Sequence, residues 1–146
     1  NHLRVRRGSV VFTSKLIDGL FPDYEAVIPL GADKTATLDR EVLRGALQRA
    51  AILSNEKYRG VKLELSPGKL RIVAHNPEQE EAVEEVEADT HVSDLAVGFP
   101  VGYLLDALAA LDGEKARLSL RDAQSSCLVQ EEASEQARHV IMPLRL

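Results

Sequence analysis

A short acidic stretch is the part of this 146-residue sequence with the clearest capacity for chemistry. Its seven carboxylates are Glu78, Glu80, Glu81, Glu84, Glu85, Glu87 and Asp89. Clustered carboxylates bind divalent cations, so one hypothesis is a metal-dependent phosphodiesterase that uses the Glu78–Asp89 cluster. The spacing follows no known ligand loop, which favours a solvated acidic face. A salt-sensitive interface with a basic partner is a third interpretation.

The histidines and the single cysteine predict neither a catalytic site nor a metal site. His2, His75, His91 and His139 are scattered, without the close spacing of metal ligands. Cys127 cannot form an internal disulfide and has no histidine near it in sequence, so we expect a small core residue. The sequence has no phosphate loop and no nucleophile elbow. We therefore expect no cofactor, no metal and no catalytic residue.

Charge is distributed unevenly along the chain. Residues 1–62 carry 11 Lys and Arg against 7 Asp and Glu, whereas residues 63–146 carry 7 against 16. The net charge of -5 therefore conceals surfaces of opposite sign, which suggests different partners for different faces. Basic residues on and after the first predicted helix are consistent with phosphate contact and equally with a solvated face. Without interleaved aromatic residues, any nucleic-acid contact would be with the backbone and independent of sequence.

The C-terminal residues are apolar and include a methionine and a proline. Residues 137–144 are predicted to form a final strand, with Pro143 at an edge or a strand end and Leu144 and Leu146 partly exposed. Exposed apolar residues near a methionine are suited to gripping an extended peptide. No uncharged run approaches the roughly 18 apolar residues that a membrane span requires, so we expect no membrane contact.

Two successive units are predicted to position these residues, each with one strand, one helix and three strands. In the first unit a strand at 34–38 precedes Asp39, the predicted N-cap of a helix that runs to about Leu53. Helical periodicity places Val42 on the buried face and Ile52 on the polar face. Strands follow at 61–65, at 70–75 and within 82–88, where the acidic side chains are expected to face water.

The second unit repeats this order. A strand at 95–99 precedes a helix in which Pro100 suits the first position and Gly113 the end. The remaining strands are predicted at 116–120, 125–130 and 137–144. The shared element order is a weak internal repeat, and it predicts an α+β domain in which a sheet is backed by two neighbouring helices.

Residues 1–32 stand apart from this repeat. Residues 3–28 are strand-like, with turns at Arg7-Gly8 and Phe21-Pro22-Asp23, and residues 29–33 are a predicted linker. The stretch is too short to be a domain, so we expect it to be the tail of a preceding one.

Four stretches distributed over the whole chain carry a resemblance to a known family. They are Phe12–Tyr24, Arg49–Gly60, Asn76–Ala82 and Met142–Leu146. Together they resemble the C-terminal portion of the bacterial DNA polymerase III beta subunit, the replicative sliding clamp. The resemblance implies the DNA clamp fold, a pseudo-two-fold pair of βαβββ units with two helices backed by antiparallel sheets. It also implies that residues 1–32 are the incomplete C-terminal tail of the middle clamp domain, and 33–146 the complete third domain.

The function implied by the resemblance is a cytoplasmic, non-enzymatic processivity factor of the replicative polymerase. Two protomers of such a clamp close into a ring around duplex DNA. A hydrophobic cleft docks polymerases, the clamp loader and repair proteins through Gln-Leu-x-Leu-Phe-like peptides. The cleft residues carried over from the family are Pro22, Val27, Ser126, Val140, Met142, Pro143, Leu144, Arg145 and Leu146. Ala26 stands where the family often has a basic residue, and Gln124 where it has an aliphatic one.

The resemblance also assigns residues to ring closure and to DNA. The dimer interface would use Ile52, Leu53, Glu78, Glu80, Glu81 and Glu84. The candidates for proximity to DNA phosphates are Arg44, Arg49, Lys57 and Arg59. An exposed isoleucine beside a carboxylate cluster is thereby explained without a metal.

Overall fold

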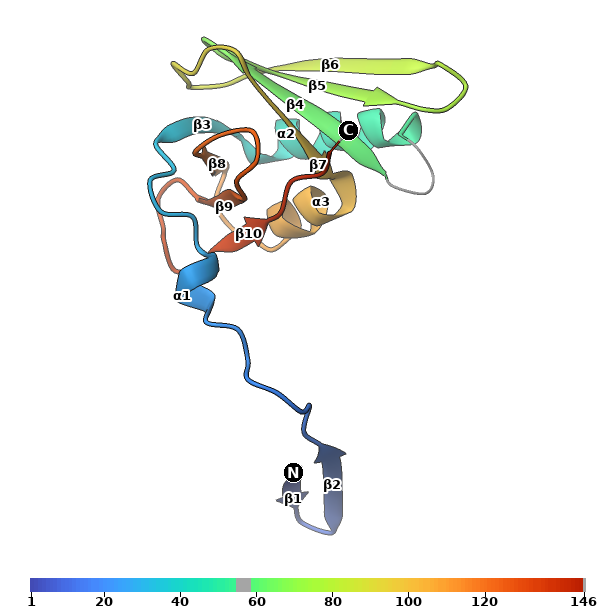
Figure 1. Cartoon of the computed structure of the whole chain (residues 1–146), viewed down its shortest axis with the longest axis vertical. Coiled ribbons are helices and arrows are strands. Elements are labelled where there is room, and N and C mark those ends of the chain that lie inside the picture. Colours follow the sequence, from blue (N-terminus) through green and yellow to red (C-terminus); the bar gives the residue numbers. More distant parts are fainter. Residues whose placement is uncertain (55–58, 146) are drawn as a thin grey trace.

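The computed structural model describes residues 1–54 and 59–145, and its main body consists of two units with the same element order (Figure 1). The first unit comprises β3 (Lys34–Asp39), α2 (Arg40–Ile52), β4 (Gly60–Ser66), β5 (Lys69–His75) and β6 (Glu81–Glu87). The second comprises β7 (Leu95–Pro100), α3 (Val101–Ala109), β8 (Lys115–Leu120), β9 (Cys127–Glu131) and β10 (His139–Ile141). This order confirms the predicted repeat of one strand, one helix and three strands.

The strands form two antiparallel four-stranded sheets, of order β10-β9-β8-β3 and β6-β5-β4-β7. Strand β3 of the first unit pairs with β8 of the second, and β7 of the second unit pairs with β4 of the first. Each unit therefore contributes its first strand to the other unit's sheet. The residue pattern alone predicted one sheet, which is wrong because this exchange divides the strands into two.

Helix α2 begins at the predicted cap and buries the face that packs on the strands. The Asp39 carboxylate accepts a hydrogen bond from the N–H of Val42 at 2.9 Å, which satisfies one of the unpaired donors of the first turn. The side chain of Val42 was predicted to be buried and is instead 53% exposed. The buried face is rotated away from Val42 towards Ala51, and Ile52 is exposed as predicted.

Helix α3 differs from its prediction at both ends. Pro100 has extended dihedral angles and pairs with Gly60 as the last residue of β7, so it is the N-cap rather than the first helical residue. The helix ends at Ala109, well before Gly113. Beyond its end, the guanidinium of Arg40 on α2 donates to the carbonyl of Leu111. Among residues 1–54 and 59–145, no helix is long and apolar enough to cross a membrane.

The N-terminal residues project from the body (Figure 1). Strands β1 (His2–Arg7) and β2 (Val10–Lys15) form a hairpin closed by the predicted turn, where Gly8 has a positive φ of 59°. An extended segment then leads to the short helix α1 (Tyr24–Val27), which was not predicted. Local capping explains this helix, because the Asp23 carboxylate accepts the N–H of Glu25 at 3.0 Å.

Candidate binding surfaces

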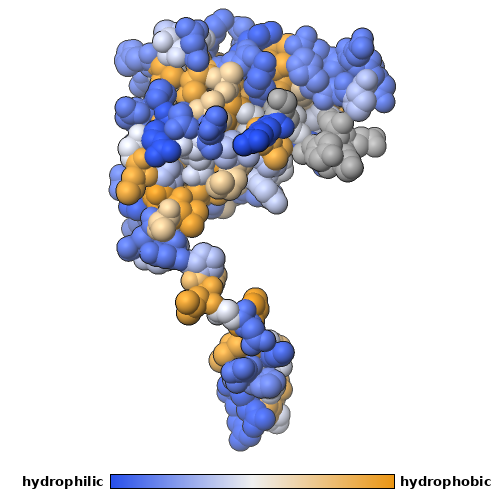
Figure 2. All heavy atoms as spheres, viewed as in Figure 1, coloured by the Kyte–Doolittle hydropathy of each residue, from blue (hydrophilic) through white to orange (hydrophobic). Residues whose placement is uncertain are grey.

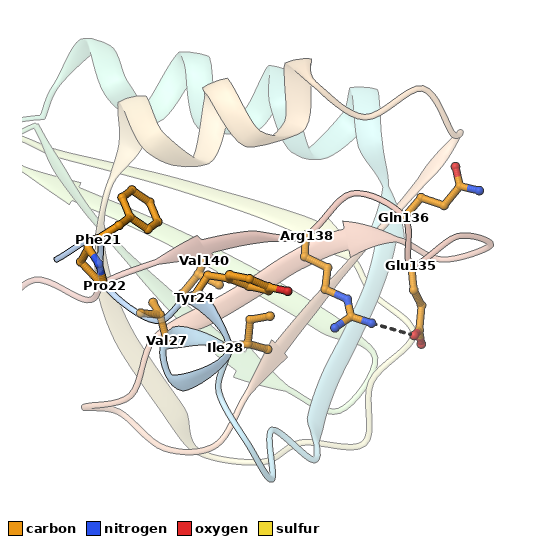
Figure 3. A pocket seen from close by; sticks show the side chains of 9 residues that line it. All are labelled: Phe21, Pro22, Tyr24, Val27, Ile28, Glu135, Gln136, Arg138 and Val140. Carbon is orange, nitrogen blue, oxygen red and sulfur yellow. Dashed lines mark hydrogen bonds and ion pairs between the residues drawn. The ribbon is translucent and has the colours of Figure 1, made fainter. Parts of the chain in front are cut away.

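An open apolar pocket of about 580 Å³ lies where α1 meets β10 (Figure 3). Its lining residues are Phe21, Pro22, Tyr24, Val27, Ile28, Glu135, Gln136, Arg138 and Val140. Figure 3 shows the ring of Tyr24 lying beside Val140, with Val27 and Ile28 below it. The guanidinium of Arg138 lies 3.4 Å from the carboxylate of Glu135 at one end. Apolar walls with one charged end suit a short extended peptide with large apolar side chains.

The extended segment contributes Phe21 and Pro22 to this pocket, and α1 contributes Tyr24 and Val27. Figure 2 shows hydrophobic side chains along the lower edge of the body and on the segment that leads to the hairpin. The exposed fractions of Phe21, Tyr24 and Val27 are 88%, 66% and 46%. Exposed apolar side chains at this density are typical of an interaction surface or a ligand-binding groove.

Three residues of the predicted peptide cleft line the pocket, namely Pro22, Val27 and Val140. The other described members are not in its lining: Ser126, Met142, Pro143, Leu144 and Arg145. Leu146 lies outside the described residues. Most of the remaining lining side chains were missed because α1 and the 135–138 segment show no periodic pattern. The one available signal was Tyr24, which ends the first stretch of the family resemblance.

The C-terminal segment leaves the sheet earlier than predicted. Strand β10 ends at Ile141 instead of continuing to Leu144. The N–H of Leu144 donates to the carbonyl of Gly98 on β7 at 2.8 Å, which ties the segment to the other sheet. Between these two anchors the side chain of Met142 is 64% exposed. The structure therefore presents Met142 as a separate apolar contact and not as part of the pocket wall.

A second candidate surface lies at the end of α2 beside β6. Ile52 is 79% exposed, more than Val42 on the same helix, and Leu53 is half-buried. The guanidinium of Arg49 donates to both oxygens of Glu84, through Nε at 2.9 Å and Nη2 at 2.7 Å. The side-chain hydrogen bond from Arg49 is the main cause that lowers the pKa of Glu84, and the bond to Glu84 is the main cause that raises the pKa of Arg49. An apolar residue thus lies beside a fixed ion pair.

The sequence predicted that the carboxylates of β6 all face water. This prediction is wrong for Glu84. Burial alternates along the strand, and the side chain of Glu84 lies on the face shared with half-buried Ala82 and buried Val86. It is 26% exposed, whereas that of Glu85 is 53% exposed on the opposite face. The physical reason is the neighbouring Arg49, which compensates the charge of a carboxylate directed towards α2.

The other acidic residues of the predicted interface have separate neighbours. The Glu80 carboxylate accepts from Nδ2 of Asn76 at 2.6 Å, and Glu81 lies 3.8 Å from Nε2 of His75. Glu78 is exposed in the turn between β5 and β6. Across the part of the chain that the structure describes, no group of three or more His, Cys, Asp or Glu residues is arranged to hold a metal ion. The geometry thus gives the metal-dependent phosphodiesterase hypothesis no support.

The four basic residues predicted to approach DNA have different surroundings. Arg44 on α2 lies 3.3 Å from Glu41 and is partly exposed. Arg49 binds Glu84, as described above. Arg59 is exposed before β4 with a positive φ of 43°, and its carbonyl accepts the N–H of Val101. Lys57 lies outside the described residues.

Comparison with known proteins relates these surfaces to a family. The model of the family described as "DNA polymerase III beta subunit, C-terminal domain" matches residues 25–145. The chain belongs to the DNA polymerase III beta subunit family. It is 53% identical over its full length to the beta sliding clamp of Pseudomonas putida, and 47% identical to that of Escherichia coli K12. It spans 40% of the length of each of these relatives.

Solved clamp structures extend this result to the fold. The Pseudomonas aeruginosa sliding clamp matches 99% of this chain with a TM-score of 0.91 and 52% identity, over 40% of its own length. The Caulobacter crescentus protein has the same TM-score at 39% identity, with 99% of this chain and 39% of that chain covered. The sequence resemblance is thus confirmed. This beta subunit domain has the predicted α+β clamp fold, with two helices packed on antiparallel sheets.

Proposed function

We propose that this chain is part of a ring-shaped sliding clamp that encircles duplex DNA and keeps a replicative polymerase on it. The observation that carries the proposal is the family match over residues 25–145 on the strand-exchanged two-unit fold. Such a clamp acts by topology and performs no chemical step of its own. The relatives are bacterial, which supports action in the cytoplasm at the replication fork.

We propose the same domain division that the sequence predicted. Residues 33–146 form the third clamp domain, and residues 1–32 form the tail of the middle one. The hairpin supports this division, because Leu3, Val5, Val10 and Phe12 are about half exposed or more, and Val5 pairs directly with Phe12. An apolar hairpin face of this kind is stable only when a further sheet or helix covers it.

The pocket between α1 and β10 is proposed as the binding site for partner peptides of the Gln-Leu-x-Leu-Phe type. Polymerase subunits, the clamp loader and repair proteins would present them. Its apolar lining supports this role, and we assign the remaining cleft contacts to Ser126 and the C-terminal segment that contains Met142. Ala26 and Gln124 are proposed to tune peptide specificity, since they replace a basic and an aliphatic residue of the family.

Ring closure is proposed to use the end of α2 and the acidic residues of β6 and of the turn before it. A second protomer would contact Ile52 and Leu53, and a basic surface on it would face the carboxylates of Glu78, Glu80, Glu81 and Glu84. Phosphate proximity is assigned to Arg44, Lys57 and Arg59 as a property of the region that faces the hole. Contacts of this kind are sequence-independent.

Retention on circular DNA tests the proposal directly. The full-length protein that contains this chain is loaded onto nicked circular DNA, and the DNA is then cut to a linear form. A topological clamp stays on the circle through gel filtration and is lost from the linear DNA, because it can slide off the ends. Equal retention on both forms would contradict the ring mechanism and favour ordinary electrostatic binding.

A further inference from the structure

Arg49 lies between the region proposed to face DNA and the surface proposed to close the ring. Its side chain contacts only the ring-closing surface, through Glu84. The sequence interpretation directed it towards DNA, but both of its hydrogen bonds described above are to Glu84, on β6. We propose that Arg49 is a positioning residue of the ring-closing surface. It fixes the Glu84 carboxylate beside Ile52, ready to receive a cation from a second protomer. This inference rests on the proposed function, because it assumes that ring closure uses this face.

The geometry restricts Glu84 to one orientation. Arg49 and Ile52 are three residues apart on the last turns of α2, so their side chains are neighbours on the helix surface. Helix α2 packs along β6, and the two parallel N–H···O bonds fix the plane of the carboxylate against it. The apolar anchor and the oriented charge are therefore parts of one preorganised face.

The bidentate pair leaves Glu84 able to accept further hydrogen bonds. An ionised carboxylate offers about four lone-pair sites, of which the Arg49 fork occupies two. The carboxyl group of Glu84 is ionised at neutral pH, and the hydrogen bond from Arg49 lowers its pKa further below the ordinary value. A complementary surface on the second protomer would present a guanidinium or ammonium group to Glu84 and, next to it, an apolar pocket for Ile52.

Two other ion pairs show what distinguishes this one. Lys69 and Glu85 lie 3.4 Å apart on the opposite face of β6, with both side chains about half exposed. Arg44 and Glu41 form a single contact of 3.3 Å within one helix. Arg49 alone in this set joins two elements through two short bonds. Breaking that fork to reach a phosphate would leave Glu84 directed towards α2 without its compensating charge.

The monomer–dimer equilibrium of the full-length protein tests the inference by sedimentation. We expect Arg49→Ala to weaken the dimer roughly threefold to tenfold, because Glu84 loses its orientation. Arg49→Lys should be intermediate, since an ammonium group cannot form the parallel fork. Arg44→Ala is the matched control on the same helix and should leave the dimer unchanged. Circular dichroism confirms that each variant is folded.

A double-mutant cycle tests whether the effect passes through Glu84. Arg49→Ala should add little to a Glu84→Gln variant, because the carboxylate that it orients is already lost. Fully additive effects would overturn the positioning role. So would an Arg49→Ala variant with an unchanged dimer and weaker, less salt-dependent retention on DNA, which would assign Arg49 to phosphate.

A benchmark variant separates failure of the inference from failure of the proposed function. Ile52→Ala combined with Leu53→Ala should shift the protein towards monomer. If that variant weakens the dimer while Arg49→Ala does not, the positioning role is wrong and the ring-closing surface stands. If neither variant affects the dimer, ring closure does not use this face and the proposed interface is itself wrong.

Discussion

The two units share a buried framework and differ in the surfaces that they present. With the helix caps Asp39 and Pro100 aligned, three buried positions of α2 match three of α3: Leu43 with Leu104, Ala46 with Ala107, and Leu47 with Leu108. The charged residues do not match. Helix α2 carries Arg40, Glu41, Arg44 and Arg49, whereas α3 carries only Asp106. The packing of the repeat is thus preserved while its outer faces serve different contacts.

The third β-strand after each helix shows the same divergence. Strand β6 is seven residues long, acidic and at the outer edge of its sheet. Strand β10 has only three residues, after which the chain crosses to β7. The first unit therefore presents a charged edge next to Ile52, and the second presents an apolar pocket beside Val140. One unit suits assembly with a basic partner and the other suits capture of a peptide.

The largest expected effect tests whether the buried frameworks are equivalent. Leu47→Ala and Leu108→Ala should each destabilise the domain by about 3 kcal/mol, because both side chains are fully buried and each substitution leaves a cavity. Urea unfolding measures the two values. A difference greater than about 2 kcal/mol would show that the two halves are packed differently despite their shared topology.

Peptide binding tests the pocket, which is lined by the second unit, by α1 and by the segment that precedes α1. Tyr24→Ala should weaken binding of a Gln-Leu-x-Leu-Phe peptide to the full-length protein about tenfold, because its aromatic ring lines the pocket beside Val140. Fluorescence anisotropy provides the measurement. Val42→Ala, which removes an exposed apolar residue on α2, is the control and should have no effect.

Met142→Ala tests whether the C-terminal segment contributes less to peptide binding than α1 does. It should cost less affinity than Tyr24→Ala, about threefold, because Met142 lies outside the pocket lining. A larger loss with Met142→Ala would move the main peptide contact from α1 to the C-terminal segment. That outcome would contradict the pocket proposed here while leaving a peptide-binding role in place.

Local sequence signals predicted most of the elements in the body of this chain. The β4–β5 hairpin followed from alternating residues around Pro67-Gly68, and α2 from Asp39 and its apolar period. The short helix α1 was missed because four residues show no period. Val42 was misplaced because it lies at the margin of the helix face, where a small rotation decides burial.

Contacts between residues far apart in the sequence could not be predicted from local sequence patterns. The exchange of β3 and β7 depends on which sheet each strand joins, and both alternatives have the same pattern of buried residues. Arg49 and Glu84 are 35 residues apart, so no local spacing predicts their ion pair. Family resemblance supplied the correct fold, but it assigned these two residues to separate surfaces because it named each one singly.

The smallest expected effect concerns a carboxylate of the second unit that lies near a charge of the first. Oε1 of Glu131 accepts the N–H groups of Asp112 at 2.7 Å and Gly113 at 3.1 Å, in the loop after α3. These backbone bonds are the main causes that lower the pKa of Glu131, and the charge of Arg40 on α2 contributes in the same direction. The first unit thus supports a carboxylate of the second.

The pH dependence of stability reports this contact. A carboxyl group with a lowered pKa in the folded state contributes stability that is present above its ordinary value of 4.5 and is lost as pH falls through the folded value. Glu131→Gln should therefore reduce the loss of stability on acidification below about pH 4.5, since a neutral amide has no charge to lose. Urea midpoints measured between pH 7 and pH 3 compare the variants, with Glu135→Gln on the surface as control. Parallel pH profiles for Glu131→Gln and the unsubstituted protein would show that the carboxylate charge of Glu131 contributes nothing to stability.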